Sequence, residues 1–158
     1  MNMEERIIYH GSQQIAEYPE IRQAKYNKDF SAGFYCTILK EQAIRWAIRH
    51  PVVGYVNEFA YRENPDLKIR HFSEMTEEWL DFIVACRSGC RHDFDIVEGP
   101  MANDTIYNYI QDFIDGNISR EAFWALAKFK YPTHQISFHT QDALKSLSFR
   151  RFEAYEKD

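Results

Sequence analysis

The sequence has too few cysteines for a disulfide-stapled protein, and its apolar runs are too short for a membrane-spanning one. Its three cysteines are an odd number, and a chain of 158 residues can bury a core without disulfide staples. Glu4 and Glu5 precede only a short apolar run, so no secretory signal peptide is recognised. No stretch approaches the length that crosses a bilayer. We therefore expect a cytoplasmic protein without disulfides or membrane spans.

The chain also lacks an excess of positive charge. It has 19 Lys and Arg against 24 Asp and Glu, which gives a net charge of −5. This balance argues against a nucleic-acid binder that works by bulk electrostatic attraction, although a local patch could still contact nucleic acid. Internal repeats, linkers and low-complexity tracts are missing as well. The sequence therefore predicts a single domain over residues 1–158.

Apolar patterning is what the sequence does have. Hydrophobic residues make up 45% and aromatic residues 16%, which suits a packed core and a pocket for a flat ligand. Alternating runs predict strands over residues 6–9, 34–37, 52–61, 67–72, 94–97, 134–139 and 147–155. Helical spacing predicts helices over residues 37–49, 76–88, 104–114 and 119–129, with a short one after Thr140. This mixture predicts an α+β fold.

Local signals suggest where these elements end. Gly11 punctuates the first strand as a turn would, and Gly99 with Pro100 ends the strand over 94–97. The polar segment 13–32 is expected to be a long loop. Hydroxyl side chains that cap helices are expected at Thr37, Thr76 and Thr140.

Three segments end strands with residues that suit the same kind of chemistry, and they are IIYHGS (7–12), GFYCT (33–37) and HQISF (134–138). The His10 imidazole can bond a sugar hydroxyl, and Gly11 has no Cβ to hold a carboxamide away from the backbone. Tyr35 offers a face for stacking on an aromatic ring. Trp46, eleven positions later, lies on the following helix and can form the second wall of a slot.

These motifs resemble the ADP-ribosyltransferase superfamily, which includes diphtheria toxin and the poly(ADP-ribose) polymerases. The resemblance rests on Y-H-G-S, then G-F-Y-x-T, then an aromatic residue eleven positions after the tyrosine. It covers the N-terminal third and one strand of the last third. It implies a split β-sandwich that binds NAD⁺ as a substrate, without a metal, through a His-Tyr-Glu signature. It also extends to a bacterial branch that is often found beside a small antitoxin-like partner.

The resemblance implies a role for each matching residue. His10 would bond the hydroxyl of the adenine-side ribose, and the backbone of Gly11 would hold the nicotinamide amide, with Ser12 completing the NAD⁺-binding segment. Tyr35 and Trp46 would sandwich the nicotinamide ring. The residue three positions before Trp46 is small in the toxin branch, and here it is Ala43.

The third signature position departs from the family. Gln135 stands where the superfamily usually has glutamate, whose charge stabilises the cationic sugar as nicotinamide leaves. Glutamine keeps the hydrogen bond without the charge, so a lower intrinsic rate is expected. In the superfamily this replacement accompanies mono-ADP-ribosylation or loss of activity.

The leading hypothesis is therefore a mono-ADP-ribosyltransferase that modifies a protein or a nucleic acid, in the manner of a toxin with an antitoxin partner. An NAD⁺ glycohydrolase or an RNA 2′-phosphotransferase on the same fold is an alternative, the latter opposed by the net charge. A catalytically silent module that binds NAD⁺ or ADP-ribose is a third.

Each residue also has a structural interpretation. His10 and Tyr35 could be satisfied structural residues, Trp46 could pack in the core, and Gln135 could be an ordinary strand residue. The paired acids of the run 95–100, Asp95 and Glu98, could orient an acceptor or act as a base. Helix capping by Asn103 or Asp104 is the preferred interpretation of this cluster. Arg87 and Arg91 could meet a pyrophosphate, although arginines at a helix end more often complement its dipole. Cys86 and Cys90 lack the spacing and the second ligand pair of a zinc site.

Overall fold

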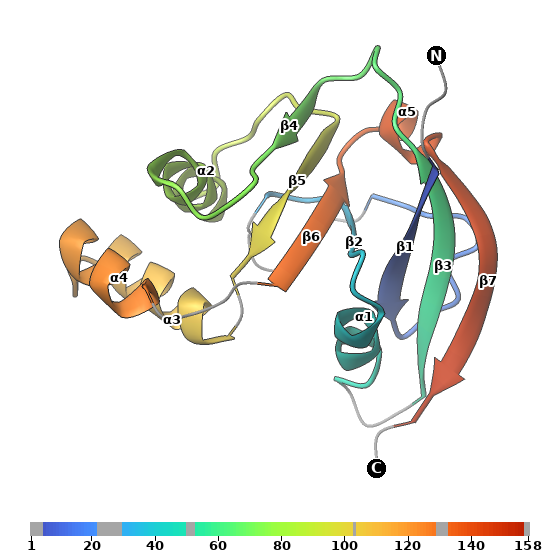
Figure 1. Cartoon of the computed structure of the whole chain (residues 1–158), viewed down its shortest axis with the longest axis horizontal. Coiled ribbons are helices and arrows are strands. Elements are labelled where there is room, and N and C mark those ends of the chain that lie inside the picture. The colour runs from blue at the N-terminus through green and yellow to red at the C-terminus, as the bar shows by residue number, and fades with distance from the viewer. Residues whose placement is uncertain (1–4, 22–29, 50–52, 103, 129–132, 157–158) are drawn as a thin grey trace.

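The computed structural model describes residues 5–21, 30–49, 53–102, 104–128 and 133–156 (Figure 1). Within these residues the fold is α+β, with two β-sheets and five helices. The sheets stand side by side, and most of the helices lie beyond the four-stranded one (Figure 1). None of the described helices is long and apolar enough to cross a membrane.

The three-stranded sheet is antiparallel, in the order β1-β3-β7. Its strands are β1 (Glu5–Ser12), β3 (Gly54–Arg62) and β7 (Leu147–Tyr155). The prediction that Gly11 turns the chain is wrong, because β1 continues to Ser12. Gly11 and Ser12 stay extended because they pair with Val56 and Tyr55 of β3.

The four-stranded sheet has the order β2-β6-β5-β4. Its strands are β2 (Phe34–Cys36), β6 (Thr133–Phe138), β5 (Ile96–Met101) and β4 (Ile69–His71). β4 runs parallel to β5, and the other pairs are antiparallel.

The prediction that Gly99 and Pro100 end the strand over 94–97 is also wrong, because β5 runs on to Met101. β4 pairs with β5 only as far as Glu98, so Pro100 lies at an open edge where a missing N–H costs no ladder bond. The carbonyl of Pro100 accepts a hydrogen bond at that edge from Trp79 Nε1, at 2.9 Å.

The helices are α1 (Lys40–Ala47), α2 (Glu77–Arg87), α3 (Asp104–Ile114), α4 (Arg120–Ala127) and α5 (Gln141–Leu144). The caps by Thr76 and Thr140 are confirmed, since their hydroxyls accept from Trp79 N and Ala143 N. The prediction that Thr37 caps α1 is wrong. The N-cap of α1 is Leu39, without a side-chain cap bond, because the backbone of Thr37 pairs with β1 instead.

Two apolar cores flank the four-stranded sheet. The core between this sheet and α2, α3 and α4 contains Phe30, Trp79, Ile83, Val97, Ile106 and Phe123. The core between the two sheets contains Ile8, Phe34, Phe59, Tyr61, Ile136 and Phe138. Burial on both faces fixes the register of this sheet, since a slip by one residue would exchange the two sets of side chains.

The sheets meet where β1 crosses the end of β2. Tyr9 and Thr37 exchange two backbone hydrogen bonds there, of 2.8 and 2.9 Å. α1 packs beside this junction on β1 and β3, with Ala43 and Ala47 fully buried (Figure 1). The first two motifs of the sequence, 7–12 and 33–37, therefore come together at one place in the fold.

Candidate functional site

His10 and Tyr35 lie next to each other at the junction of the sheets. The His10 Nδ1–H donates to the carbonyl oxygen of Tyr35, at 2.6 Å. The imidazole also stacks on the Phe34 ring, with centroids 4.0 Å apart and planes inclined by 21°. A bond to a carbonyl oxygen requires a proton on Nδ1, so the neutral ring carries its lone pair on Nε2.

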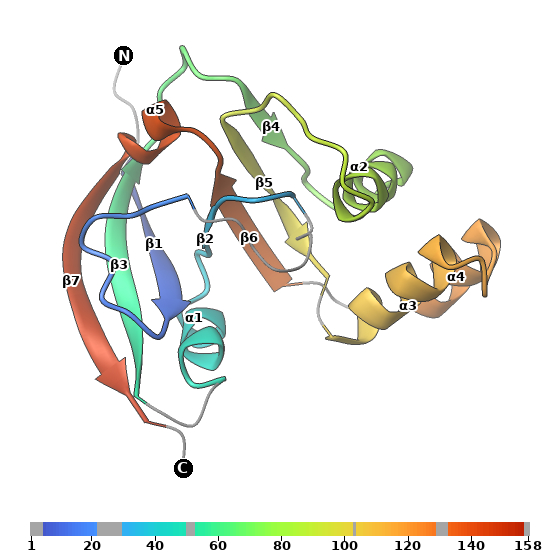
Figure 2. The same ribbon diagram turned by 180° about the vertical axis from the view of Figure 1, so that it is seen from behind.

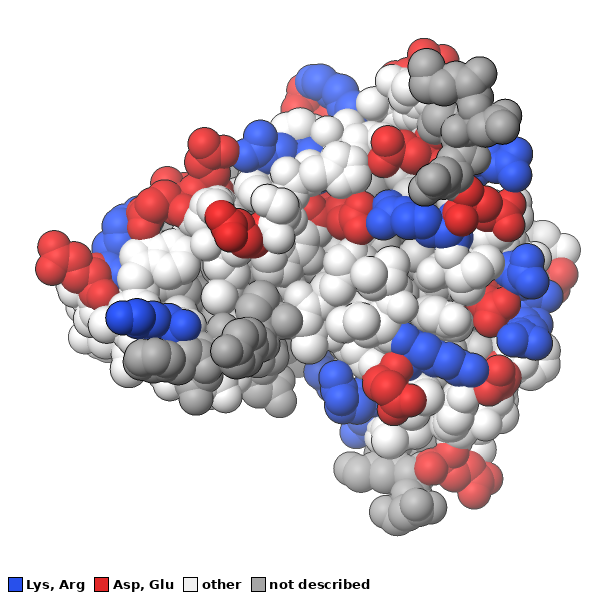
Figure 3. All heavy atoms as spheres, viewed as in Figure 1, with Lys and Arg blue, Asp and Glu red and all other residues white. Residues whose placement is uncertain are grey.

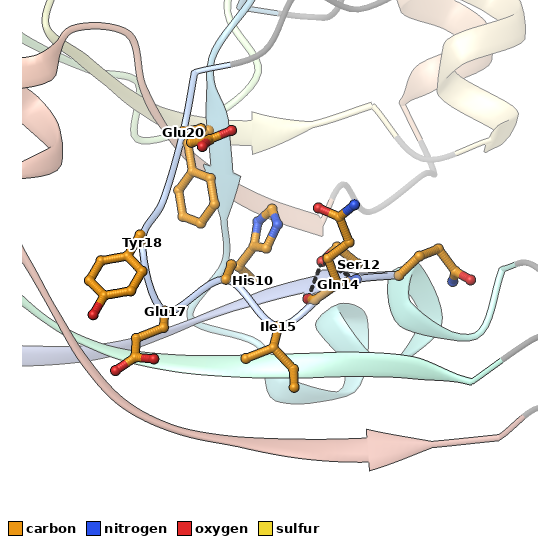
Figure 4. Close-up of a pocket in the computed structure, with 10 residues that line it drawn as sticks. His10, Ser12, Gln14, Ile15, Glu17, Tyr18 and Glu20 are labelled. Atoms are coloured by element: carbon orange, nitrogen blue, oxygen red, sulfur yellow. Dashed lines mark hydrogen bonds between the residues drawn. The ribbon is translucent and has the colours of Figure 1, made fainter.

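A cavity of about 500 Å³ opens beside His10 (Figure 4). This volume lies within the range of small-molecule sites. In the close-up, the ring of His10 stands out of β1 toward the loop that follows the strand. The described residues that line the cavity are His10, residues 12–18, Glu20 and Phe34.

The loop that forms one wall of this cavity is fastened to β3 by one side chain. Asn57 is fully buried and accepts a hydrogen bond from Ala16 N at 2.7 Å. Its amide nitrogen donates to the carbonyls of His10 and Gln14, at 3.2 and 3.1 Å. Ser12 tightens the same loop, since its hydroxyl donates to Gln14 O and accepts from Gln14 N. The loop crosses β1 and β3 on the side seen in Figure 2.

Gly11 is required by the packing of α1. A Cβ at this position would lie 1.9 Å from the carbonyl oxygen of Ala43. Ala43 itself is fully buried on this face of the helix. Along an antiparallel strand the backbone groups alternate in direction, so those of Gly11 point to the same edge as those of Tyr9, which face β2. The packing of α1 therefore explains Gly11 without any ligand. The backbone N–H and C=O of Gly11 point to the edge of β1 that faces β2.

The ring of Tyr35 lies on the other face of β2 from Phe34, because successive side chains of a strand alternate. Its hydroxyl donates to Ser31 O and accepts from Phe30 N at 3.2 Å. The ring also meets His139 edge-on, with centroids 6.2 Å apart. Tyr35 thus holds the segment before its own strand, in which Ser31 has a φ of +79°.

His139 holds the same segment. Its Nδ1–H donates to Ala32 O at 2.7 Å, and its Nε2 lies 2.7 Å from the Ser137 hydroxyl. Burial lowers the pKa of His139 to about 4, although the hydrogen bond to Ala32 opposes this shift. The ring is therefore neutral at physiological pH.

Gln135 lies with Tyr35 and away from His10. Tyr35 pairs with Ser137, and Gln135 is two residues along β6, so the three side chains share the sheet face that packs against α2 and α3. Gln135 is 2% exposed and pairs with Gly99 of β5. The structure brings the second and third signature residues onto one face, and the first onto the other.

Trp46 lies half-buried on α1, on the side of the helix that carries Gln42. The Gln42 amide reaches the four-stranded sheet, where its nitrogen donates to His134 O and Met101 Sδ, each at 3.3 Å. The side of α1 that carries Trp46 therefore faces the end of β5 and the start of β6. These strands belong to the four-stranded sheet, which also contains Tyr35.

A partly buried charged cluster links the two sheets near this site. Arg6 of β1 donates two hydrogen bonds, of 2.8 and 2.9 Å, to the carboxylate of Glu98 on β5. His134 Nε2 donates to the same carboxylate at 2.8 Å, and its Nδ1 accepts from Ile38 N. Burial opposes ionisation of Glu98, but the bonds from His134 and Arg6 outweigh it and lower its pKa to about 2. The cluster anchors the turn that leads from β2 into α1.

The chain matches, over residues 6–149, the model of a family described as "Protein of unknown function (DUF3990)". The chain belongs to this family. No curated protein and no solved structure matches it. The matched segment of DUF3990 contains every residue of the site described above.

Two of the remaining candidate residues of this DUF3990 chain, Asp95 and Arg87, have structural partners. Asp95 accepts from Lys68 N and from the Thr140 hydroxyl, at 2.9 and 2.6 Å, so it joins β4 to α5. The Arg87 guanidinium lies over the Tyr107 ring, 4.0 Å from its centroid, in the last turn of α2. Asn103 lies outside the described residues, and α3 begins at Asp104. Cys86 is buried and Cys90 is exposed. Among the described residues, no group of three or more His, Cys, Asp or Glu could hold a metal.

Two groups that organise the site of this DUF3990 chain, Asn57 and His134, were not predicted from the sequence. A signal for Asn57 was present, because it is a polar residue inside the apolar run 52–61. His134 stands in the third motif beside Gln135, where no role was predicted for it. Its partner Glu98 is 36 positions away, and Glu98 is 92 positions from its other partner Arg6, so no local pattern relates the three residues.

Acidification is expected to destabilise this protein in two stages. The folded-state pKa of His139, about 4, is below its ordinary value of 6.5, so the unfolded chain binds more protons between these values. The free energy of unfolding therefore falls by on the order of 2–3 kcal/mol as the pH drops from about 6.5 to 4. Glu98 contributes stability above its ordinary pKa of 4.5, which is lost as the pH falls toward 2.

Urea unfolding between pH 8 and 3 measures the first stage. The variant His139→Gln is expected to flatten the dependence between pH 6.5 and 4. A His139→Gln curve parallel to the wild-type curve throughout this window would contradict the assignment.

Proposed function

We propose that this protein binds NAD⁺ in a fold of the ADP-ribosyltransferase type and transfers ADP-ribose to a macromolecule, with release of nicotinamide. The observation that carries the proposal is the contact between His10 and the backbone of Tyr35, at the junction of two sheets and beside a cavity of about 500 Å³. This contact joins two motifs that are 25 positions apart and that match the superfamily in order and spacing.

In the proposed complex each part of the junction has a role. His10 Nε2 accepts a hydrogen bond from a ribose hydroxyl, while Nδ1 stays bonded to Tyr35 O. The edge-facing N–H and C=O of Gly11 pair with the nicotinamide carboxamide, which has the complementary donor and acceptor. Tyr35 and Trp46 border the nicotinamide ring, one from β2 and one from α1.

The reaction breaks the bond between the ribose anomeric carbon and the nicotinamide nitrogen. The bonding electrons leave with nicotinamide, which becomes neutral, and the sugar becomes cationic. An acceptor nucleophile then bonds to the anomeric carbon and loses its proton to solvent. Because the leaving group is already a cation, positioning and electrostatics supply most of the rate. Gln135 adds a polar group without charge, so a modest intrinsic rate is expected.

The charges of the site oppose an RNA 2′-phosphotransferase. Among the described residues that line the cavity, Glu17 and Glu20 are the charged ones, and neither supplies the cation that a transferred phosphate requires. On the face seen in Figure 3, basic and acidic side chains are interspersed over the described residues. A 2′-phosphotransferase requires a basic face for its phosphates.

A silent NAD⁺-binding module is the second candidate. The burial of Gln135, at 2% exposure on the sheet face away from His10, favours it. A residue in this position contacts a ligand near His10 only if the neighbouring segments move. In this alternative the cavity binds the dinucleotide, and Gln135 is a core residue.

Nicotinamide release from NAD⁺, with and without cell extract, tests the proposal. We expect release that rises with extract in the wild type and is lost in Tyr35→Ala. Tyr35→Phe keeps the ring but removes the hydroxyl that holds Phe30 and Ser31, so it separates ring contact from loop support. Tyr107→Ala, at an exposed tyrosine of α3, is the matched control.

Gln135→Glu decides between the two candidates. It is expected to speed release from an attenuated transferase, since it restores a negative charge near the cationic sugar. A folded wild type and a folded Gln135→Glu variant that both bind NAD⁺ but release no nicotinamide would refute transfer and leave the module.

A further inference from the structure

His134, near the start of β6, joins three parts of the fold through hydrogen bonds. Its Nε2–H donates to the carboxylate of Glu98 on β5, at 2.8 Å. Its Nδ1 accepts from the backbone N–H of Ile38, which precedes α1, at 3.2 Å. Its carbonyl accepts from the side-chain amide of Gln42, in the first turn of α1, at 3.3 Å. One residue of the four-stranded sheet therefore holds both the turn that enters α1 and the helix itself.

These bonds matter to α1 because the start of this helix has no side-chain cap. Its N-cap residue is Leu39, which makes no cap hydrogen bond through its side chain. The helix lies between the start of β6 and the three-stranded sheet (Figure 1). Ala43 and Ala47 pack it on the three-stranded sheet, whereas the buried amide of Gln42 joins it to the four-stranded one. The bonds of His134 therefore fix how α1 sits relative to β6.

Two residues of the proposed reaction lie on either side of these bonds. Trp46 is one helical turn beyond Gln42, on the same side of α1. Gln135 is the residue that follows His134 in β6. A change in the bonds of His134 therefore moves Trp46 relative to the sheet that carries Gln135 and Tyr35.

The surrounding groups hold the His134 ring in one orientation. Arg6 of β1 donates two hydrogen bonds to Glu98, so this carboxylate is fixed where it accepts the Nε2–H of His134. His71 of β4 lies 3.3 Å from the same carboxylate, and its other nitrogen lies 3.2 Å from Glu63. From α1 the partner is a neutral amide. With its proton on Nε2, the neutral ring has its lone pair on Nδ1, toward the turn before α1, and a second proton on Nδ1 would end this bond.

We propose that His134 is a positioning residue of this site: its neutral imidazole, held by Glu98, fixes α1 and so places Trp46 beside the ring of the ligand. This inference rests on the proposed function, because Trp46 borders the nicotinamide ring only in that function. His134 takes no part in the chemical step, and its effect passes through α1. Protonation of His134 releases the turn before α1, so the rate of nicotinamide release falls on acidification.

Two substitutions separate the bonds of the ring. In His134→Asn the amide oxygen takes the place of Nδ1 and can accept from Ile38 N. In His134→Gln the longer amide reaches the place of Nε2 and can donate to Glu98, but the acceptor for Ile38 is lost. We expect His134→Gln to lower kcat for nicotinamide release roughly ten-fold or more, because one wall of the site is misplaced, and His134→Asn to stay closer to the wild type. His71→Gln, which changes a neighbour of the same carboxylate but no bond to α1, is the control.

Fluorine NMR of the full chain labelled with 5-fluorotryptophan gives a readout that does not depend on turnover. The resonance of Trp46, assigned with Trp46→Phe, is expected to shift in His134→Gln and to stay close to its wild-type position in His134→Asn. Acidification should shift this resonance in the wild type, and less in His134→Asn, which has no ring to protonate.

A Trp46 resonance that is unmoved in His134→Gln, or an equal loss of kcat in the two variants, would overturn the positioning role. If the Trp46 resonance behaves as expected in a protein that releases no nicotinamide, His134 still positions α1, and the proposed transfer alone is refuted.

Discussion

His10→Ala is expected to weaken NAD⁺ binding by roughly 10- to 100-fold. The change removes the acceptor for a ribose hydroxyl and the stack on Phe34, and it leaves the Tyr35 carbonyl without the donor at 2.6 Å. It also opens space between β1 and the loop held by Asn57. The loss should appear in the dissociation constant, measured by calorimetry, and in nicotinamide release at low NAD⁺ concentration.

His10→Asn is the informative partner of this variant, because its amide can keep a hydrogen bond to Tyr35 O without the imidazole. His71→Ala, at a half-exposed histidine of β4, controls for the loss of a histidine elsewhere. Normal affinity for NAD⁺ in folded His10→Ala would remove His10 from the site and, with it, the main support for the proposed function.

Gly11→Ala is expected to lower the free energy of unfolding by roughly 3 kcal/mol, because its Cβ would lie 1.9 Å from a backbone oxygen of α1. A backbone atom cannot turn aside as a side chain does, so the helix itself must move. Gly54→Ala is expected to cost a similar amount, since its Cβ would lie 1.8 Å from the carbonyl oxygen of Ala47 in the same helix. Thermal and urea unfolding of both variants measure this effect.

Comparison of Gly11→Ala with Gly54→Ala also separates the effect of helix packing from the effect on NAD⁺ binding. Both changes displace α1, but only Gly11 has its backbone at the edge proposed for the carboxamide. We expect Gly11→Ala to lose more NAD⁺ affinity than Gly54→Ala at equal loss of stability. If the two variants lose stability and affinity in parallel, Gly11 serves α1 alone.

The sequence predicted the α+β class and most of the helices and strands, because these elements carry local signals. The capping threonines and the strong apolar spacing located α2, α3 and β7 well: α3 and β7 begin and end at the predicted residues. The errors lie where distant pairing overrides a local signal. Gly11 and Pro100 suggest turns, yet β3 pairs with the first and an open sheet edge tolerates the second.

The site was predictable only in part for a similar reason. The motifs pointed to His10 and Tyr35, and the structure makes them neighbours. No pattern in the sequence indicates that the two rings lie on different sides of β2, or that Asn57 fastens the loop after β1. These facts depend on the crossing of β1 over β2 and on the pairing of β1 with β3, which join residues far apart in the chain.

The placement of His10 and Tyr35 on opposite sides of β2 restricts the shape of any ligand that touches both. A single rigid ring system can contact only one side of the strand. A molecule of two rings joined by a flexible link can contact both if it folds around the end of the strand, and NAD⁺ has this construction. Bound NAD⁺ would then be bent, with its two bases in separate environments, and analogues locked in an extended shape would be excluded.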